Sequence, residues 1–457
     1  MSKTTLTFVG GADMVTGSNF LLTDTESDTS MLVDCGLFQG CEDCDMKNRE
    51  AFPYNPADID ILFVTHAHID HVGRIPKLVK DGFRGVIWST PATKDIAALM
   101  LEDSFKVMTF HAKKEGAPEP FFDEKDIAKT LAMWQTREYH DTSNVQGGYT
   151  AEFFDAGHIL GSAMVKITRG ERSIVLTGDL GNSPSPIIRD TEALPPTQYL
   201  VMESVYGDRN HEEKEGRTEY LKQAVEETIA RKGTLVIPVF SLERTQVLLY
   251  ELNNLIEEGE VSSVPVFLDS PLAIAVTDIY RKYQKYYNAD VSQEIAAGDD
   301  IFSFPKLSFT ESRDESMDIN KIPGPKIVLA GSGMSGGGRV LHHEKRYLSD
   351  PKNTLLLVGY QVPGTLGRAL QDGVKEVTIF GDTIQVKVQI KHITGYSAHK
   401  DSDHLLEFAA DAKDSLEKVF VAMGELKSAS FLAQRLRDFY DIDATVPKAG
   451  EEVILDL

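Results

Sequence analysis

Residues 65–71 hold the densest group of metal-ligand side chains in the chain and read Thr-His-Ala-His-Ile-Asp-His. They follow directly on the apolar run 61–64, which is typical of a buried strand. No regular element turns all four ligand-type side chains one way, because a strand sends His71 to the face opposite His66 and a helix spreads His66 and His68 apart. The segment is therefore expected to be a loop at a strand end, folded around a pair of metal ions. Imidazole and carboxylate ligands favour zinc, manganese or iron over magnesium or calcium.

Composition limits the number of domains and the partners. A chain of 457 residues with 42% hydrophobic and 26% charged residues should form two or three domains with full cores. Its net charge of −23 argues against loose, non-specific binding to nucleic acid, which relies on a basic surface. A polyanionic substrate would therefore have to be held by local basic groups or by metal.

The cysteines and the N-terminus bear on location. The three cysteines, Cys35, Cys41 and Cys44, lie close together, which suggests a reducing compartment, and we expect Cys41 and Cys44 to be free thiols. Residues 1–10 alternate like a strand and lack the apolar core of a signal peptide. No run of about 18 apolar residues occurs, so we expect no membrane span and a cytoplasmic protein.

Several short apolar runs end in a ligand-type residue. The run 31–33 ends at Asp34, 61–64 leads to the histidines, 173–176 is followed by Asp179 and 199–202 by Glu203. Enzymes built on sheets place their chemistry just past the carboxyl ends of strands. Four such cases in one half of the chain indicate that these segments share a site.

From about residue 205 the pattern becomes one of alternating strands and helices. Helices are expected over 212–231, 242–258 and after Pro271, and strands over 234–239, 264–268, 327–330 and 354–358. This alternation predicts a separate domain with a parallel sheet covered on both faces. The polar stretch 299–318 is expected to be a loop region.

Distal residues could complete a metal site or bind phosphate. His158 lies in a glycine-flanked turn, and Asp179 follows a strand and a glycine, so its carboxylate could bridge two cations. Taken alone, a histidine such as His158 is more often structural, and Asp179 could equally be a turn residue. Candidate phosphate donors are Arg244, Ser332, Arg339 and the amides around Gly336 and Gly337. The glycines could form an anion cradle at a helix N-terminus or only permit close packing. For His342 and His343, on the helix that follows, we expect surface or packing roles.

These residues occur in an order that resembles a known family. Asp34, the motif at 66–71, His158 and Asp179 resemble the metallo-β-lactamase superfamily. Further segments resemble its β-CASP branch, whose members include RNA-processing nucleases such as the pre-mRNA 3′-end cleavage endonuclease and RNase J. Those segments are 203–208, 237–246, 269–273, 331–339, 359–368 and 397–399. The resemblance implies an α/β fold: an αββα sandwich with an inserted β-CASP domain, a parallel sheet flanked by helices. The implied domains are 1–204 and 391–457, the two parts of the sandwich, and 205–390.

The resemblance also implies residue roles. His66, His68 and His158 would bind a first zinc ion, Asp70 and His71 a second, and Asp179 would bridge the two. Asp34 would orient a ligand or the water. Glu203 and His399 would transfer a proton to the leaving oxygen. Asp70, Asp34, Glu203 and His399 are thus the expected catalytic residues.

One position departs from the family pattern. Nuclease members carry a zinc-binding histidine in a Val-His-Gly-Glu stretch, and the matching stretch here, 421–425, places Met423 at that position. A thioether is a soft, weak ligand for a hydrolytic zinc ion. The second metal is therefore expected to bind more weakly, to be a different ion or to be absent. Glu425 and His404 are the nearest possible substitutes in this part of the sequence, and we expect neither to bind the second metal.

The resulting prediction is a zinc-dependent phosphodiesterase, an endo- or exoribonuclease that cleaves single-stranded RNA through a metal-bound hydroxide. A homodimer of this chain is a further possibility that the sequence leaves open. The alternative is a catalytically weakened homologue that acts as a scaffold or binding partner, because Met423 replaces an expected ligand. A small-molecule hydrolase is disfavoured by the inserted domain, and an oxygen-reducing di-iron protein by His68, where that branch has a glutamate.

Overall fold

The computed structural model describes residues 3–211 and 216–457 and forms two compact units. Unit 1 comprises Met1–Asn210 and Ala398–Leu457, and unit 2 comprises His211–Ser397. The boundaries predicted from the sequence, 204/205 and 390/391, lie a few residues before these. Unit 2 is thus an insertion between the two chain segments that together form unit 1.

Two seven-stranded sheets form the centre of unit 1. The first has the order β22-β1-β2-β3-β4-β5-β6, antiparallel at the β22 side and parallel from β3 to β6. Its strands are β1 (Lys3–Gly10), β2 (Asn19–Asp24), β3 (Thr29–Val33), β4 (Ile61–Phe63), β5 (Val86–Ser89), β6 (Trp134–Thr136) and β22 (Glu452–Asp456). Because β3 and β4 run parallel, their carboxyl ends lie at one edge of the sheet.

The second sheet has the order β21-β20-β11-β10-β9-β8-β7, and β10, β11, β20 and β21 run parallel. Its strands are β7 (Ser143–Asn144), β8 (Tyr149–Asp155), β9 (Ala163–Arg169), β10 (Arg172–Leu176), β11 (Tyr199–Met202), β20 (Lys418–Val421) and β21 (Ala444–Thr445). The last part of the chain therefore returns to unit 1 and completes this sheet.

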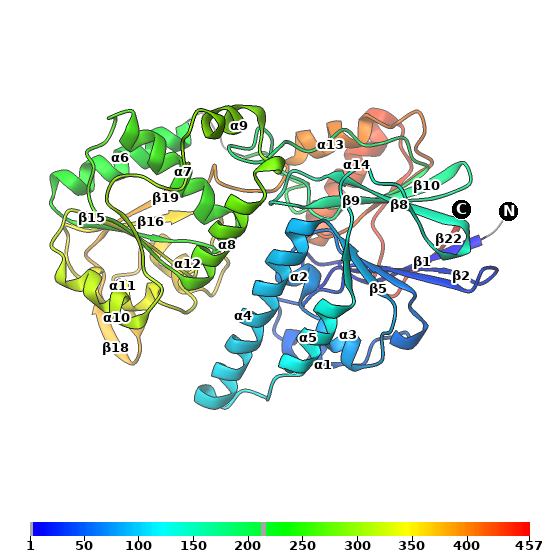
Figure 1. Cartoon of the computed structure of the whole chain (residues 1–457), viewed down its shortest axis with the longest axis horizontal. Coiled ribbons are helices and arrows are strands. Elements are labelled where there is room, and N and C mark those ends of the chain that lie inside the picture. The colour runs from blue at the N-terminus through cyan, green and yellow to red at the C-terminus, as the bar shows by residue number, and fades with distance from the viewer. Residues whose placement is uncertain (1–2, 212–215) are drawn as a thin grey trace. The chain divides into compact units, whose positions relative to one another are not determined.

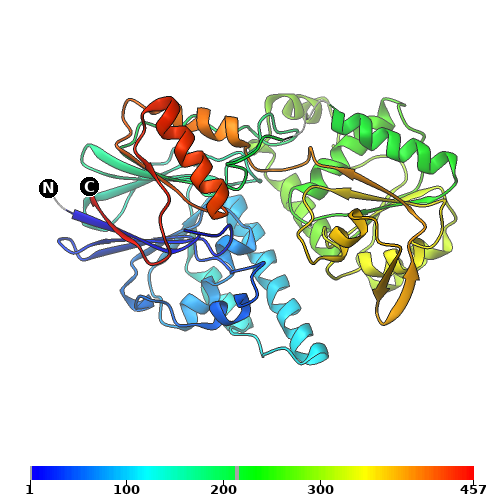
Figure 2. The same cartoon turned by 180° about the vertical axis from the view of Figure 1, so that it is seen from behind.

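Helices cover the outer face of each sheet. One large core lies between the sheets and joins residues such as Phe8 and Phe63 to Phe153 and Phe420. A second core packs the other face of the second sheet against α13 (Ser402–Ala410) and α14 (Leu426–Tyr440), drawn in orange and red in Figure 2. Figure 1 shows the helices beside the first sheet, α1 (Cys44–Arg49), α2 (Ile69–Val72), α3 (Ile75–Lys80), α4 (Pro91–Glu115) and α5 (Glu124–Ala132). The predicted αββα sandwich is confirmed.

Unit 2 is built on a six-stranded parallel sheet of order β14-β13-β15-β12-β16-β19. Its strands are β12 (Thr234–Pro238), β13 (Val266–Asp269), β14 (Leu307–Phe309), β15 (Lys326–Ala330), β16 (Thr354–Val358) and β19 (Gln389–Ile393), with a separate hairpin of β17 (Glu376–Ile379) and β18 (Asp382–Gln385). Helices lie on both faces (Figure 1), which confirms the predicted architecture. They are α6 (Arg217–Ala230), α7 (Arg244–Glu257), α8 (Pro271–Lys282), α9 (Ala289–Ala296), α10 (Arg313–Asp318), α11 (Val340–Tyr347) and α12 (Leu366–Gln371).

One local prediction is tested only in part, and another is wrong. The first four residues of the helix predicted over 212–231 lie outside the described residues, and α6 begins at Arg217. The expected loop region 299–318 is wrong, because it contains β14 and α10. Ser312 caps α10 in a reciprocal capping box with Glu315, which satisfies backbone amides at the start of this short polar helix.

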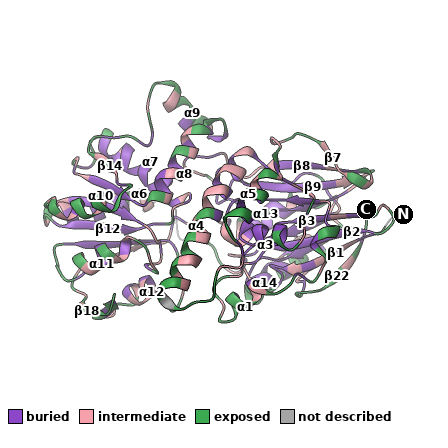
Figure 3. Ribbon diagram, turned by 60° about the horizontal axis from the view of Figure 1, so that its bottom comes forward, coloured by how far each residue is buried: buried purple, intermediate pink, exposed green. Residues whose placement is uncertain are grey.

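Burial follows the layers of each unit. Figure 3 shows central strands such as β12 as buried, whereas the hairpin strand β18 and the helix α10 are largely exposed. Among residues 3–211 and 216–457, no helix is both long enough and apolar enough to cross a membrane.

Candidate metal centre

The ligand-type residues of unit 1 gather past the carboxyl ends of its parallel strands. Asp34 follows β3, the histidine motif follows β4, Asp179 follows β10 and Glu203 follows β11. The motif is a loop only as far as His68, since residues 69–72 form the single turn of α2. The segment after β3 packs closely against α2. A Cβ atom at Gly36 would lie 1.5 Å from the carbonyl oxygen of Asp70, so this contact requires glycine.

Four side chains converge on one point. The Nδ1 atom of His68 lies 3.1 Å from Nε2 of His66 and 3.2 Å from Nε2 of His158. The Oδ2 atom of Asp179 lies 3.4 Å from Nε2 of His66 and 3.5 Å from Nε2 of His158. A tetrahedral zinc ion with bonds of about 2.0–2.1 Å has ligands about 3.3 Å apart. The donor set and its spacing therefore fit a tetrahedral metal ion.

The electrostatics of the cluster also suit a cation. Burial, reinforced by nearby imidazoles, holds the pKa values of His68 and His158 well below the usual histidine value. Both rings are therefore neutral, which is the form that binds metal. Burial opposes ionisation of Asp179, but the His71 and His66 rings outweigh it and hold its pKa well below the usual range.

Asp34 anchors the other side of the centre and is fully buried. Its Oδ2 accepts hydrogen bonds from Nδ1 of His71 at 2.7 Å, from the Thr65 hydroxyl at 2.8 Å and from the Ser18 hydroxyl at 3.1 Å. The Thr65 amide donates to Oδ1 at 2.8 Å. A carboxylate held in this way fixes the plane of the imidazole and leaves its other nitrogen for a metal.

That other nitrogen, Nε2 of His71, is buried and has no hydrogen-bond partner within the described part of the chain. It lies 3.5 Å from Oδ1 of Asp179. Burial opposes charging of the His71 ring, but the Asp179 and Asp34 carboxylates outweigh it and raise its pKa well above the usual value. An orphaned buried nitrogen beside a carboxylate oxygen is the mark expected of a second cation position.

This second position has fewer candidate ligands close together than the first. Asp70 follows His68 in α2, and burial raises the pKa of its carboxyl. Neither Asp70 nor His71 belongs to a group of three or more ligands as tight as the first cluster, as far as the described residues show. Met423 is buried in the core between the sheets, and its sulfur lies 3.8 Å from the Ser18 hydroxyl that binds Asp34. Glu425 and His404 lie outside both candidate ligand groups, and Nδ1 of His404 contacts Asp401 at 2.7 Å.

Glu203 and His399 form a pair beside Asp179. Glu203 is buried after β11, and its Oε1 accepts a hydrogen bond from the Leu180 amide at 2.6 Å and lies 3.3 Å from Nδ1 of His399. Burial opposes charging of His399, but the Glu203 carboxylate outweighs it and raises the pKa of His399 to about 9. The neighbouring Ala398 carbonyl accepts from Nδ1 of His158 at 3.2 Å, so this segment also orients a cluster ligand.

Comparison with known proteins identifies the family. Family models match the chain in order, as Metallo-beta-lactamase superfamily over residues 14–224, Beta-Casp domain over 245–370 and Zn-dependent metallo-hydrolase RNA specificity domain over 383–447. The chain is 37% identical over 401 residues to Ribonuclease TTHA0252 of Thermus thermophilus, a match that covers 87% of this chain and 89% of that one. The chain belongs to the β-CASP branch of the metallo-β-lactamase superfamily. The family resemblance seen in the sequence is thus confirmed, as is the expectation of a metal-dependent enzyme.

Two further matches of this β-CASP enzyme are consistent with the family assignment. It is 33% identical to Transcription termination factor FttA of Methanosarcina mazei, over 94% of this chain and 68% of that protein. A crystal structure of a protein of unknown function from Enterococcus faecalis V583 matches with a TM-score of 0.61 and 16% identity, covering 99% of this chain and 100% of that one. At that identity the match shows a shared fold alone.

In unit 2 of the β-CASP enzyme, the predicted phosphate donors have different surroundings. Arg244 begins α7 and is 9% exposed, and its Nε and Nη1 have no hydrogen-bond partner among the described residues. The Ser332 hydroxyl accepts from the Gly336 amide at 3.0 Å, while Gly337 is half-buried. Arg339 binds the Asp269 carboxylate at 2.7 Å. Arg244 is therefore the member of this set with unused donors that are already buried.

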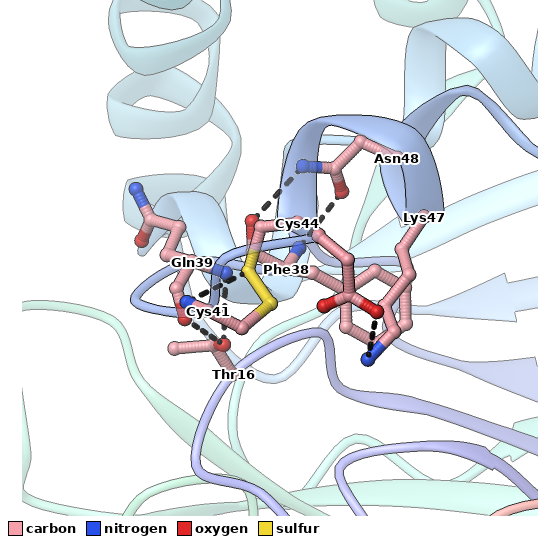
Figure 4. Close-up of a disulfide and its surroundings, with 8 residues drawn as sticks. Thr16, Phe38, Gln39, Cys41, Cys44, Lys47 and Asn48 are labelled. Carbon is pink, nitrogen blue, oxygen red and sulfur yellow. Dashed lines mark hydrogen bonds and ion pairs between the residues drawn. A yellow bond between two sulfur atoms is a disulfide. The ribbon is translucent and has the colours of Figure 1, made fainter.

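The prediction of free thiols at Cys41 and Cys44 is wrong. The two cysteines form a disulfide, with Cα atoms 5.1 Å apart (Figure 4), and Cys35 is the free, buried one. A turn before α1, which begins at Cys44, brings the Cys44 thiol within reach of Cys41. The Thr16 hydroxyl and the Asn48 amide group tie the same loop through Gln39 and Phe38.

Thr65 and Ser18, which anchor Asp34, were not identified from the sequence. The position of Thr65, between the strand and the first histidine, was the available signal. Ser18 gave none, because its contact with Asp34 joins two loops.

Proposed function

We propose that this chain is a zinc-dependent ribonuclease that hydrolyses phosphodiester bonds of single-stranded RNA. The observation that carries the proposal is the cluster of His66, His68, His158 and Asp179, whose donor atoms have tetrahedral spacing. Support for RNA comes from the names of the relatives, a ribonuclease and a transcription termination factor, and from the matched RNA specificity domain. Neutral imidazoles with a carboxylate favour zinc.

In this proposal the cluster residues would hold the first ion. Asp70, His71 and Asp179 would hold the other. When bound, the ions would supply positive charge to the scissile phosphate and acidity to a water molecule. Asp34 holds the His71 ring so that Nε2 faces Asp179.

The proton for the leaving oxygen is assigned to His399. Glu203 contacts Nδ1 of that ring at 3.3 Å, and we assign to Nε2 the proton that passes to the departing oxygen, which then leaves as a hydroxyl group. Glu203 is itself fixed by the Leu180 amide, so the pair is oriented before substrate arrives. Asp34, Asp70, Glu203 and His399 are the residues to which we assign catalysis.

Substrate grip is assigned to unit 2, with Arg244 as the main phosphate contact. A buried guanidinium without hydrogen bonds is costly, and the Glu243 carboxylate, 3.7 Å from Nε, is too far for one. A phosphate accepts two parallel hydrogen bonds from such a group. Ser332, Arg339 and the Gly336 and Gly337 amides are weaker candidates. The cytoplasmic location and the homodimer stay predictions.

The test is cleavage of end-labelled single-stranded RNA together with metal analysis of the purified chain. His66→Ala removes one donor of the cluster and should lower turnover at least about 10³-fold and deplete bound zinc. His140→Ala, an exposed histidine of the same unit, is the matched control and should change neither quantity. Unchanged turnover in His66→Ala would rule out the proposed metal chemistry. Labels at the 5′ and 3′ ends distinguish endo- from exonuclease cleavage.

The scaffold alternative rests on Met423. If the zinc-loaded chain binds RNA but leaves it uncut, whereas Met423→His cleaves it, the chain is a binding partner with a weakened second metal position. Cleavage by the native chain at a rate typical of enzymes, about 1 per second or faster, excludes that role.

A further inference from the structure

A hollow of about 560 Å³ lies on the surface of unit 2, between α10 and α11. Pockets for small ligands have volumes of about 300–1,000 Å³, so this one has room for a single nucleotide. Six of its nine lining residues are basic and none is acidic. The basic residues are Arg313, Arg339, His342, His343, Lys345 and Arg346. That composition, with four residues of Lys or Arg and none of Asp or Glu, contrasts with a whole chain of 70 Asp and Glu against 47 Lys and Arg.

The charges around the hollow are only partly balanced. Arg339 pairs with Asp269 at 2.7 Å, and Lys345 pairs with Asp382 at 2.5 Å. Arg313 forms no ion pair, and Arg346 contacts a backbone carbonyl of Asn320, so neither has a carboxylate partner in the described parts of unit 2. Burial, followed by the neighbouring His343, Arg313 and Lys345, lowers the pKa of His342. The hollow therefore carries an excess of positive charge.

A buried ring nitrogen in the wall lacks a partner. His343 is 2% exposed, its Nε2 lies 2.7 Å from Oδ2 of Asp269, and its Nδ1 has no hydrogen bond with any residue that the structure describes. Asp269 also binds Thr310 and Ser316, so four donors hold this carboxylate. The His343 ring is thereby fixed, with Nδ1 left without a hydrogen bond in a residue that lines the hollow. Such an orphaned polar atom in the wall of a cavity indicates a missing hydrogen-bond partner.

We propose that this hollow binds the phosphate of a nucleotide, with Arg313 and Arg346 as its charged contacts and Nδ1 of His343 as a further polar contact. The walls also offer apolar surface to the rest of a nucleotide, because Met317 is 54% exposed at the hollow and the His342 ring, which packs on Phe380 with centroids 4.6 Å apart, lines it. The nucleotide could belong to an RNA strand or be free, and the shared chemistry is the phosphate on a nucleoside. The site goes beyond the proposed metal chemistry, and only its strand source rests on the proposed function.

The experiment measures binding of four probes to the full chain: adenosine 5′-monophosphate, adenosine, inorganic phosphate and a 5′-phosphorylated RNA hexamer. His66→Ala is present throughout so that the hexamer stays uncut. We expect the monophosphate to bind and adenosine to bind at least tenfold more weakly. Arg313→Gln with Arg346→Gln should raise the dissociation constant of the monophosphate at least about tenfold, since the charge-assisted hydrogen bonds from both guanidinium groups to the phosphate are removed.

Lys352→Gln is the matched control, since Lys352 is an exposed cation of the same unit that does not line the hollow. It should leave binding unchanged. A photoreactive azido-adenosine monophosphate should label peptides of 313–320 or 340–347. Tighter binding of the hexamer than of the monophosphate identifies a strand as the source, and the reverse order identifies free nucleotide.

Three results would overturn the site: equal binding of adenosine and its monophosphate, equal loss in Lys352→Gln and in the double variant, or labelling confined to other peptides. His343→Gln keeps a polar group beside Asp269 and should weaken binding less than the double variant does. Because the readout is binding in unit 2, failure of this site and failure of RNA cleavage at the metal centre are observed separately.

Discussion

Asp34 in unit 1 and Asp269 in unit 2 are built alike. Each ends a buried parallel strand or follows it directly, each is fully buried, and each lies 2.7 Å from a histidine ring nitrogen. In both pairs the second ring nitrogen, Nε2 of His71 or Nδ1 of His343, is buried without a hydrogen-bond partner among the described residues. The same device thus fixes an imidazole and leaves one of its nitrogens open in both units.

What surrounds the open nitrogen differs. Nε2 of His71 lies 3.5 Å from the Asp179 carboxylate, which has two more imidazoles beside its other oxygen. Nδ1 of His343 belongs to the wall of a hollow whose unpaired charges are the guanidinium groups of Arg313 and Arg346. A carboxylate environment attracts a cation, and a guanidinium environment attracts an anion. The local motif therefore does not decide the ligand, whereas the charges of its neighbours do.

Of the substitutions that disrupt either carboxylate–histidine pair, we expect Asp269→Asn to have the largest effect, and we expect that effect on the stability of the fold. Asp269→Asn should lower the free energy of unfolding by about 3 kcal/mol, because it leaves the half-buried Arg339 guanidinium without its carboxylate. Hydrogen exchange measured by mass spectrometry on peptides of β13 and α11 checks this, since exchange there should accelerate. Asp314→Asn, an exposed carboxylate on α10, is the control and should have little effect.

The stability contributed by Asp269 should also depend on pH. Burial opposes ionisation of Asp269, but hydrogen bonds from His343, Ser316, Arg339 and Thr310 outweigh it and lower its pKa from 3.8 to about 2. The folded state therefore favours the ionised form, so the stabilisation is complete above about pH 4 and is lost as the pH falls toward 2. Protection of β13 should decline over this range in the native chain and less in Asp269→Asn. An equal decline in both would show that Asp269 does not carry the effect.

At Asp34 the expected effect is on metal binding rather than on folding. Asp34→Asn keeps an acceptor for Nδ1 of His71 but removes the charge, and it should weaken metal binding or turnover about 10- to 100-fold. The backbone φ of Asp34 is 59°, a conformation that asparagine tolerates. Competition with a chelator measures the affinity, and Asp269→Asn is the cross-control, since it should leave metal affinity unchanged. Equal metal loss in both variants would remove the distinction drawn between the two devices.

The two devices were not equally visible in the sequence. Asp34 could be placed near the histidine motif because both follow apolar runs that predict neighbouring strands. The contact between Asp269 and His343 joins residues 74 positions apart, and only the packing of α11 on the sheet brings them together. The polar stretch that contains α10 was interpreted as a loop, although Ser312 and Glu315 have the spacing of a capping box. The clustering of residues at the carboxyl ends of neighbouring strands was therefore predictable, whereas a contact that depends on how a helix packs on the sheet was not.

The smallest expected effect concerns Met423. Met423→His should restore a ligand beside the Asp34–His71 pair and raise the affinity for a second ion about tenfold, because imidazole binds zinc better than a thioether does. The native chain should retain about one ion after dialysis, at the complete cluster, and the variant about two. Met423→Leu, which keeps the apolar packing of this buried position, is the control and should stay at one. Zinc measured per chain by mass spectrometry decides the matter. An unchanged count in Met423→His would show that the second cation position does not depend on this residue, and His71 Nε2 would then need another explanation for its lack of a partner.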